Sequence, residues 1–252
     1  LANCSLLDEA TAAAEAATMM YGLRSRDQQK KGTNVLFVDE SIFPQNLAVI
    51  QTRVIPQGMK IQVGNYKELE FTPEIFACII QYPNASGSVE DYREFVEKAH
   101  AANCKVAVDA DILSLALLLP PGEWGADIVF GSTQRLGIPL FYGGPSAAYF
   151  ATRDEYKRNM PGRIIGLSKD KYGKICYRMA LQTREQHIKR EKATSNICTA
   201  QALLATMAGF YAVYHGQEGI KNIAKRIHSI ATWLNKALAR LGYVQHNEIF
   251  FD

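Results

Sequence analysis

Two carboxylates, Asp109 and Asp111, follow the apolar run Lys105–Val108 and could take part in chemistry. In an open parallel sheet, ligands bind beyond the carboxyl ends of the strands, so an acidic side chain there can meet a ligand. Such a carboxylate could pair with the protonated ring nitrogen of a cofactor. Aspartate also caps helices, and Ile112–Leu118 could form one. For Asp111 we favour the cap, and for Asp109 both interpretations stay open.

Two short glycine-containing stretches could bind an anion. The first, Gly131–Arg135, places hydroxyls, an amide and a guanidinium after a strand, which suits a phosphate or a carboxylate. The second, Phe141–Pro145, has two adjacent glycines whose backbone amides could approach an anion closely. Each has an ordinary alternative, because strand exits and Gly-Gly-Pro turns are common without any ligand.

The stretch Gln182–Asn196 is dense in charged and amide side chains, and His187 is the histidine best placed there for proton transfer. From the spacing alone, we favour a solvated helix face that ends in a Thr-Ser-Asn cap. The sequence lacks the motifs of the nucleophile elbow, the P-loop, the zincins and the dinucleotide-binding fold. Those four classes of site therefore have no support.

Composition excludes further classes. The five cysteines are odd in number and far apart, which favours reduced thiols and argues against a zinc site, so we expect no metal. No apolar run is long enough to cross a membrane. The net charge is +3, but residues 153–192 carry 12 Lys and Arg against 5 Asp and Glu. This basic segment favours an anionic partner, and no nucleic-acid-binding motif accompanies it.

The elements that position these residues alternate short apolar strands with helices, which indicates a mostly parallel sheet covered by helices on both faces. A helix is predicted over 6–21 with Ser5 as its cap, a loop over 28–33, and a helix from Ser88 to about Asn103. Strands are expected at residues 35–38, 59–63, 76–81, 105–108, 127–130 and 147–151.

After about residue 180 the pattern becomes helical, with long helices over 197–214 and 219–241 and Gly242 at the end of the second. Residues 1–245 are expected to form one large domain, and 246–252 to begin a small domain that is missing. The sequence starts at Leu1 and its last residues, Ile249–Asp252, read like a strand cut short. We therefore expect a piece of a longer protein.

Six stretches, in this order along the chain, together resemble the amino-terminal half of the P-protein family of glycine decarboxylases. They are Asn3–Ala16, Pro120–Ile128, Gly131–Arg135, Tyr142–Pro145, Met160–Arg163 and Gln182–Thr199. The resemblance implies the large domain of fold type I, the aminotransferase-like fold of pyridoxal-phosphate enzymes. It also implies decarboxylation of glycine with pyridoxal phosphate and transfer of the aminomethyl group to the lipoyl arm of a small carrier protein, the H-protein.

In the active half of this family, a His-Lys pair precedes the glycine-rich turn, and its lysine holds the cofactor. The matching residues here are Gln134 and Arg135. A guanidinium stays protonated and cannot form the Schiff base, so the resemblance implies a half that is not catalytic by itself. We expect it to pair, as a dimer, with the lysine-bearing half, or else to have a purely structural role.

The site residues that we assign are those of a shared or vestigial cofactor site. We expect cofactor contacts from Asp109, Ser132, Tyr142, Gly143 and Gly144, and substrate contacts from Arg184 and His187. The turn at Tyr142–Gly144 is expected to touch the cofactor phosphate of the partner, and Asp109 and Ser132 are the contacts for a cofactor bound without a covalent bond. The compartment would be the bacterial cytoplasm or the mitochondrial matrix.

Overall fold

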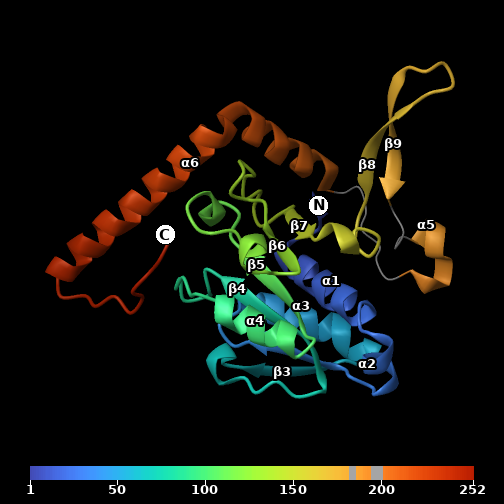
Figure 1. Cartoon of the computed structure of the whole chain (residues 1–252). Helices are drawn as coiled ribbons and strands as arrows, with labels where there is room; N and C mark the ends of the chain where they lie inside the picture. The colour runs from blue at the N-terminus through green and yellow to red at the C-terminus, as the bar shows by residue number, and fades with distance from the viewer. Residues whose placement is uncertain (182–185, 194–200) are drawn as a thin grey trace.

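The structure, a computed structural model, describes residues 1–181, 186–193 and 201–252. Its centre is a seven-stranded sheet in the order β1-β7-β6-β5-β4-β2-β3, with helices on both faces (Figure 1). All neighbouring pairs from β6 to β3 are parallel, whereas β7 is antiparallel to both β6 and β1. The predicted mostly parallel α/β architecture is therefore confirmed.

The strands of this sheet are short and largely apolar. They are β1 (Ala2–Leu6), β2 (Val35–Asp39), β3 (Lys60–Gly64), β4 (Ile75–Tyr82), β5 (Lys105–Ala110), β6 (Ile128–Ser132) and β7 (Ala148–Thr152). The sequence predicted β2 to β7 with bounds that differ by one or two residues, and it did not predict β1. Every residue of β2 and of β4 is buried. Burial on both faces explains why these strands read as continuous apolar runs instead of alternating ones.

The two faces of the sheet carry different helices. Leu36 and Val38 of β2 share a core with α1 (Glu9–Gly22) and α3 (Pro44–Val54). Their neighbours Val35 and Phe37 point the other way, into a core with α4 (Arg93–Ala101). This alternation follows from the two-residue period of a strand. α1 is almost entirely buried, so its alanine-rich sequence reflects close packing against the sheet.

Three local predictions were wrong because side-chain caps lie elsewhere. Ser5 belongs to β1, and Asp8 caps α1 by accepting the backbone N–H of Thr11 at 2.6 Å. The predicted loop at 28–33 begins inside α2 (Arg26–Lys30), which starts with a capping box on Ser25. Ser88 caps no helix, since it forms an isolated bridge with Phe250, and α4 begins five residues later.

Several connections between these elements contain a single turn of 3-10 helix. These turns are η1 (Ile55–Gln57), η2 (Tyr66–Glu68), η3 (Ser114–Ala116), η4 (Pro121–Trp124), η5 (Asp154–Tyr156) and η6 (Arg190–Lys192). The helix considered for 112–118 is thus only the turn η3. The strand expected at the end of the chain is only the isolated bridge at Phe250.

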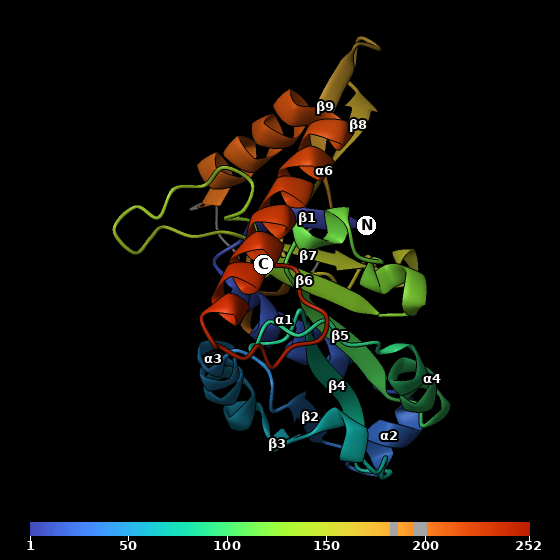
Figure 2. The ribbon, with the colours of Figure 1, turned by 90° about the vertical axis from the view of Figure 1, so that its left-hand side faces the viewer.

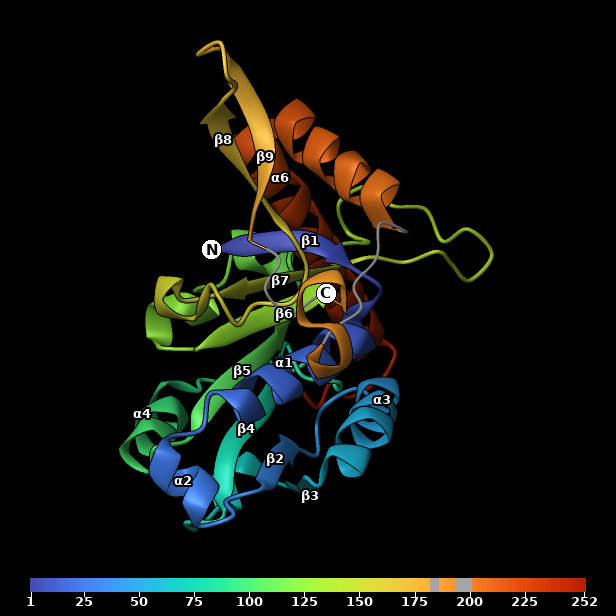
Figure 3. The same ribbon diagram turned by 90° about the vertical axis from the view of Figure 1, so that its right-hand side faces the viewer.

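The segment after residue 160 contains an antiparallel hairpin that the sequence did not predict. It is formed by β8 (Ile164–Lys169) and β9 (Ile175–Leu181), and it projects from the body of the molecule (Figure 3). The short helix α5 (Gln186–Lys189) follows. The hairpin was missed because its alternation is weak: apolar and charged side chains lie on both strands, and most are exposed.

The last element is α6 (Ala202–Arg240), which bends sharply where the two predicted long helices meet (Figure 1). The bend is at Gly216, whose φ of 62° and ψ of −179° are not helical. At the other end, Gly242 and Tyr243 donate their N–H groups to Ala239 and Leu238, which is the Schellman arrangement expected of a glycine there. The start predicted at residue 197 lies outside the described residues. Among the described helices, none is long and apolar enough to span a membrane.

Candidate functional site

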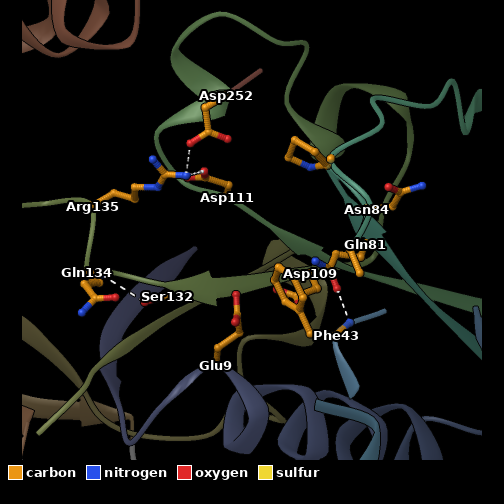
Figure 4. Close-up of a pocket in the computed structure, with 13 residues that line it drawn as sticks. Glu9, Phe43, Gln81, Asn84, Asp109, Asp111, Ser132, Gln134, Arg135 and Asp252 are labelled. Carbon is orange, nitrogen blue, oxygen red and sulfur yellow. Dashed lines mark hydrogen bonds and ion pairs between the residues drawn. The ribbon is translucent and has the colours of Figure 1, made fainter. Parts of the chain in front are cut away.

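A cleft of about 300 Å³ opens at the carboxyl ends of β4, β5 and β6, where the sheet topology places ligands in this class of fold. Gln81, Asp109 and Ser132 reach it from the three strands, and Gln134 and Arg135 from the loop after β6 (Figure 4). Glu9 closes one side from the first turn of α1, and Asp252 another from the end of the chain. Three of the predicted site residues, Asp109, Ser132 and Arg135, thus line one cleft.

Asp109 is the most buried acid of the cleft. It lies within β5 and is 1% exposed, so it is not a helix cap. Its Oδ2 accepts a hydrogen bond from Nδ2 of Asn46 at 2.6 Å. Burial raises the pKa of Asp109 well above its usual range, and the neighbouring carboxyl of Glu9 raises it further.

Glu9 and Asp109 form a carboxyl pair. Burial also raises the pKa of Glu9, although hydrogen bonds with Asp109 and with the backbone N–H of Ser132 oppose the shift. Two adjacent buried carboxylates cannot both ionise at low cost, which favours the protonated form of Asp109. In this cleft the carboxyl of Asp109 is therefore already engaged by Asn46 and Glu9.

Arg135 is the cationic side chain of the cleft lining, and it is held by two carboxylates (Figure 4). Its Nη2 lies 2.9 Å from Oδ2 of Asp111 and also pairs with Asp252. Burial opposes the charge, but Asp111 and Asp252 outweigh it and raise the pKa of the guanidinium. Asp111 also accepts the backbone N–H of Leu113 at 2.8 Å, which is an Asx turn. The helix cap favoured from the sequence is wrong, because the N-cap of η3 is Leu113, without a side-chain hydrogen bond.

The cleft does not fit pyridoxal phosphate. Its described lining contains no lysine, and the acidic side chains Glu9, Asp109, Asp111 and Asp252 face one guanidinium that two of them already occupy. The amino terminus of α1, a place where phosphate could bind, is filled by the side chain of Asp8. A phosphate dianion here would meet like charges without free cations.

The turn at Tyr142–Gly144 lies away from this cleft. It is the tip of a loop that projects from the body of the molecule (Figure 2), and Tyr142 is fully exposed. Backbone N–H groups of Gly143 and Gly144 donate to the carbonyl oxygen of Leu140 at 2.8 and 3.0 Å. Phe141 and Tyr142 have the positive φ values of 46° and 58°, which non-glycine residues adopt at a cost. Within this chain, the turn does not share a site with Asp109 and Ser132.

The two expected substrate contacts cannot be located in the same way. Arg184 lies outside the described residues, and His187 lies in α5, where the position of its side chain is not described. The sequence did not point to Glu9 or Asn46 as cleft residues. For Glu9 a signal existed, because a helix that follows a strand directly starts near the edge of the sheet. For Asn46, in the first turn of α3, the sequence offered none.

Comparisons with known proteins agree with this architecture. The model of the family described as glycine cleavage system P-protein matches residues 1–252. The chain is 79% identical to the glycine dehydrogenase (decarboxylating) of Bacteroides fragilis, and 54% identical to the mitochondrial one of Dictyostelium discoideum. Both matches cover all of this chain but only 27% and 25% of the relatives. The chain thus spans about a quarter of the length of these curated relatives.

Solved structures give the fold. A crystal structure of glycine decarboxylase (P-protein) in inhibitor-bound form superposes with a TM-score of 0.89 at 33% identity, over 100% of this chain and 58% of that one. A sphingosine-1-phosphate lyase from Burkholderia pseudomallei superposes with a TM-score of 0.63 at 14% identity, over 95% of this chain and 54% of that one. These neighbours are pyridoxal-phosphate enzymes of fold type I, so the predicted fold is confirmed. The chain belongs to the glycine cleavage system P-protein family.

Proposed function

We propose that this chain is the amino-terminal, non-catalytic half of a glycine decarboxylase and that it works by pairing with a lysine-bearing catalytic half. The proposal rests on Arg135, which the family resemblance matches to the cofactor lysine and which forms ion pairs with Asp111 and Asp252. An arginine at this position cannot form the Schiff base, and the described residues of the cleft offer no lysine instead. The reaction must then take place in the partner.

The reaction that we assign to the whole enzyme is the decarboxylation of glycine. Pyridoxal phosphate, bound by the catalytic half, supplies the electron sink, and the aminomethyl group passes to the lipoyl arm of the H-protein. For this half we propose no chemical step. Residues 1–245 would be its large domain, residues 246–252 would lead into its small domain, and the pair would reside in the bacterial cytoplasm or the mitochondrial matrix.

The loop that carries Tyr142, Gly143 and Gly144 is our proposed contact with the partner. It supports this role because it projects from the body with an exposed aromatic tip, and no other atom lies within 4 Å of a Cβ added at either glycine. In the pair, the turn would reach the cofactor phosphate of the catalytic half. Arg184 and His187 remain the proposed glycine contacts, and Asp109 and Ser132 the contacts for any cofactor that binds this half without a covalent bond.

An absorption spectrum of the purified chain with pyridoxal phosphate tests the non-catalytic role. The mixture is measured before and after borohydride treatment and desalting. We expect no retained cofactor, because the cleft is acidic and lacks a lysine. Cofactor that is retained through desalting but not fixed by borohydride would indicate non-covalent binding through Asp109 and Ser132. A cofactor fixed by borohydride onto one lysine of this chain would contradict the proposal.

The substitution Gly143→Val distinguishes a loop that completes the partner's site from a purely structural half. Gly143 has a φ of 101°, and a Cβ added there would meet no other atom within 4 Å, so a side chain would distort the turn without disturbing the body. We expect the activity of the full enzyme to fall about tenfold, which corresponds to about 1.4 kcal/mol, with assembly intact.

The matched control is Gly58→Val, because Gly58 has a φ of 84° and equally open surroundings but lies between η1 and β3. Turnover with glycine and lipoylated H-protein is compared alongside size-exclusion profiles. Unchanged turnover in the Gly143 variant would favour the structural role. In that case core changes such as Ile227→Asp, beside Phe251, would matter and loop changes would not.

A further inference from the structure

A second pocket lies at the amino ends of β5 and β6, at the opposite end of these strands from the cleft. Its volume is about 270 Å³, and it is bounded by α2, the end of α4 and the start of β5, which lie side by side in Figure 3. Three of its lining side chains are basic, His100, Lys105 and Arg153, and one is acidic, Asp127. The charge of this pocket is therefore opposite to that of the cleft.

Asp127 forms only long contacts with Lys105 and Arg153. It is 2% exposed, and its Oδ2 accepts the backbone N–H of Val106 and Nε2 of His100, each at 2.9 Å. The hydroxyl of Tyr156 donates to its Oδ1 at 3.5 Å. Lys105 and Arg153 approach Oδ1 only to 3.9 and 3.7 Å, beyond a good hydrogen bond. Oδ2 of this buried carboxylate is thus satisfied by other donors, and Lys105 and Arg153 make only long contacts with Oδ1.

Both cations keep donors for a ligand. Lys105 donates to the hydroxyl of Tyr156 at 2.7 Å, which occupies one of its three N–H groups. Arg153 donates through Nη2 to the carbonyl oxygen of Gly125, while its Nη1 has Glu155 only at 4.0 Å. Among the described residues, these are the polar contacts of Lys105 Nζ and Arg153 Nη1 besides the long approaches to Asp127.

The backbone that follows the end of α4 also borders the pocket. Its carbonyl oxygen at Asn103 already accepts a hydrogen bond from Nε2 of Gln28 in α2 at 3.0 Å. The side chain of Gln28 is thereby fixed on the wall. Lys105 and Arg153 therefore have N–H donors without partners among the described residues. They share this pocket with one buried carboxylate, that of Asp127.

We propose that this pocket binds a small oxyanion, a phosphate or carboxylate group, between Lys105 and Arg153. A tetrahedral or planar anion can accept from an ammonium and a guanidinium at once, and such charge-assisted hydrogen bonds are the stronger ones. The cavity of about 270 Å³ is large enough for such a group. The site does not depend on the proposed role of the chain in glycine decarboxylation, since it lies at the opposite end of β5 and β6 from the cleft.

The test is calorimetric titration of the full-length, cofactor-saturated protein with sodium phosphate at constant ionic strength, with chloride as the reference. We expect Lys105→Met and Arg153→Met each to weaken phosphate binding about tenfold, the effect of losing one charge-assisted hydrogen bond. The control Lys98→Met removes the same charge from an exposed pair with Glu94 and should bind like the parent. Thermal unfolding of each variant verifies that it is folded.

Sodium acetate in a parallel titration identifies the ligand class. Tighter binding of phosphate indicates a phosphoryl group, and tighter binding of acetate a carboxylate, provided that the Lys105 and Arg153 variants lose the binding in question. Two results would overturn the proposal. One is no heat above that of chloride for either anion. The other is binding that both variants retain in full, which would place the anion elsewhere in the protein.

Discussion

The carboxyl groups of Asp109, in β5, and Glu9, in the first turn of α1, lie next to each other. Either acid alone could serve a ligand, but Asp109 already accepts a hydrogen bond from Asn46 and pairs with Glu9. Arg135 is likewise paired with Asp111 and Asp252. The ionisable groups Glu9, Asp109 and Arg135 are therefore partnered within the chain, which accords with a half that leaves the chemistry to its partner.

The substitution Asp109→Asn should stabilise the protein at alkaline pH. The folded-state pKa of Asp109 is raised by burial, so the stability that the protonated acid supports is present below its usual pKa of 3.8 and is lost as the pH rises. Asparagine does not ionise and can still accept from Asn46. We expect a gain of about 1–2 kcal/mol in the free energy of unfolding at pH 8 and almost none at pH 4.

Urea denaturation of both proteins at the two pH values measures this difference. A loss of stability at pH 8 would mean that the ionised carboxylate is favoured in the folded protein, which would contradict a raised pKa of Asp109. The substitution Asp91→Asn serves as a control, since Asp91 is an exposed aspartate whose pKa is lowered by Arg93 to about 2. This control should shift the pH dependence in the opposite direction.

At the scale of elements, the bend in α6 decides where the second limb of this helix lies. The second limb packs Ala224 and Ile227 against Leu113 and Phe251, and His228 lies 2.9 Å from the carbonyl oxygen of Phe251. This packing brings the end of the chain to the cleft, where Asp252 meets Arg135. A straight α6 would direct the second limb away from the sheet.

Gly216→Ala should destabilise the protein, because a φ of 62° with a ψ of −179° is accessible essentially to glycine alone. We expect a loss of about 1–3 kcal/mol in the free energy of unfolding. Gly209→Ala is the matched control in the same helix, where nothing lies within 4 Å of an added Cβ, and should stabilise by about 0.5–1 kcal/mol. Thermal or urea unfolding separates the two, and equal effects would contradict this account of the bend.

At the scale of the whole molecule, many large apolar side chains are exposed to solvent. On α6, Phe210, Val213, Tyr214 and Trp233 are all exposed, and Phe210 is 70% exposed. The hairpin β8–β9 adds apolar side chains on its exposed strands, and a two-stranded hairpin is marginal by itself. Apolar surface of this kind marks an interface, which supports the proposed pairing with another half.

The isolated chain should therefore self-associate, and Phe210→Glu should reduce the association. A charge at this exposed position opposes burial in an interface but should leave the monomer folded. Sedimentation velocity at micromolar concentration measures the change, with Gln217→Glu as a control that adds the same charge to α6. A parent chain that stays monomeric at these concentrations would contradict the prediction.

The sequence by itself determined the family and the mostly parallel sheet, and it predicted that Arg135 takes the place of the cofactor lysine. These are local or covalent facts: strands buried on both faces need continuous apolar runs, and a guanidinium cannot become an imine. It also indicated the break between the last two helices, because the apolar pattern predicts separate helices over 197–214 and 219–241.

Only the tertiary structure decided what the cleft contains. Glu9, Asn46 and Asp109 come from three separate elements, and their pairing depends on how α1 and α3 pack on the sheet. The contacts of Arg135 with Asp252 and of Lys105 with Tyr156 join residues 117 and 51 positions apart. No spacing in the sequence reports such contacts, because burial and register set the distance between side chains, and both arise only when the layers assemble.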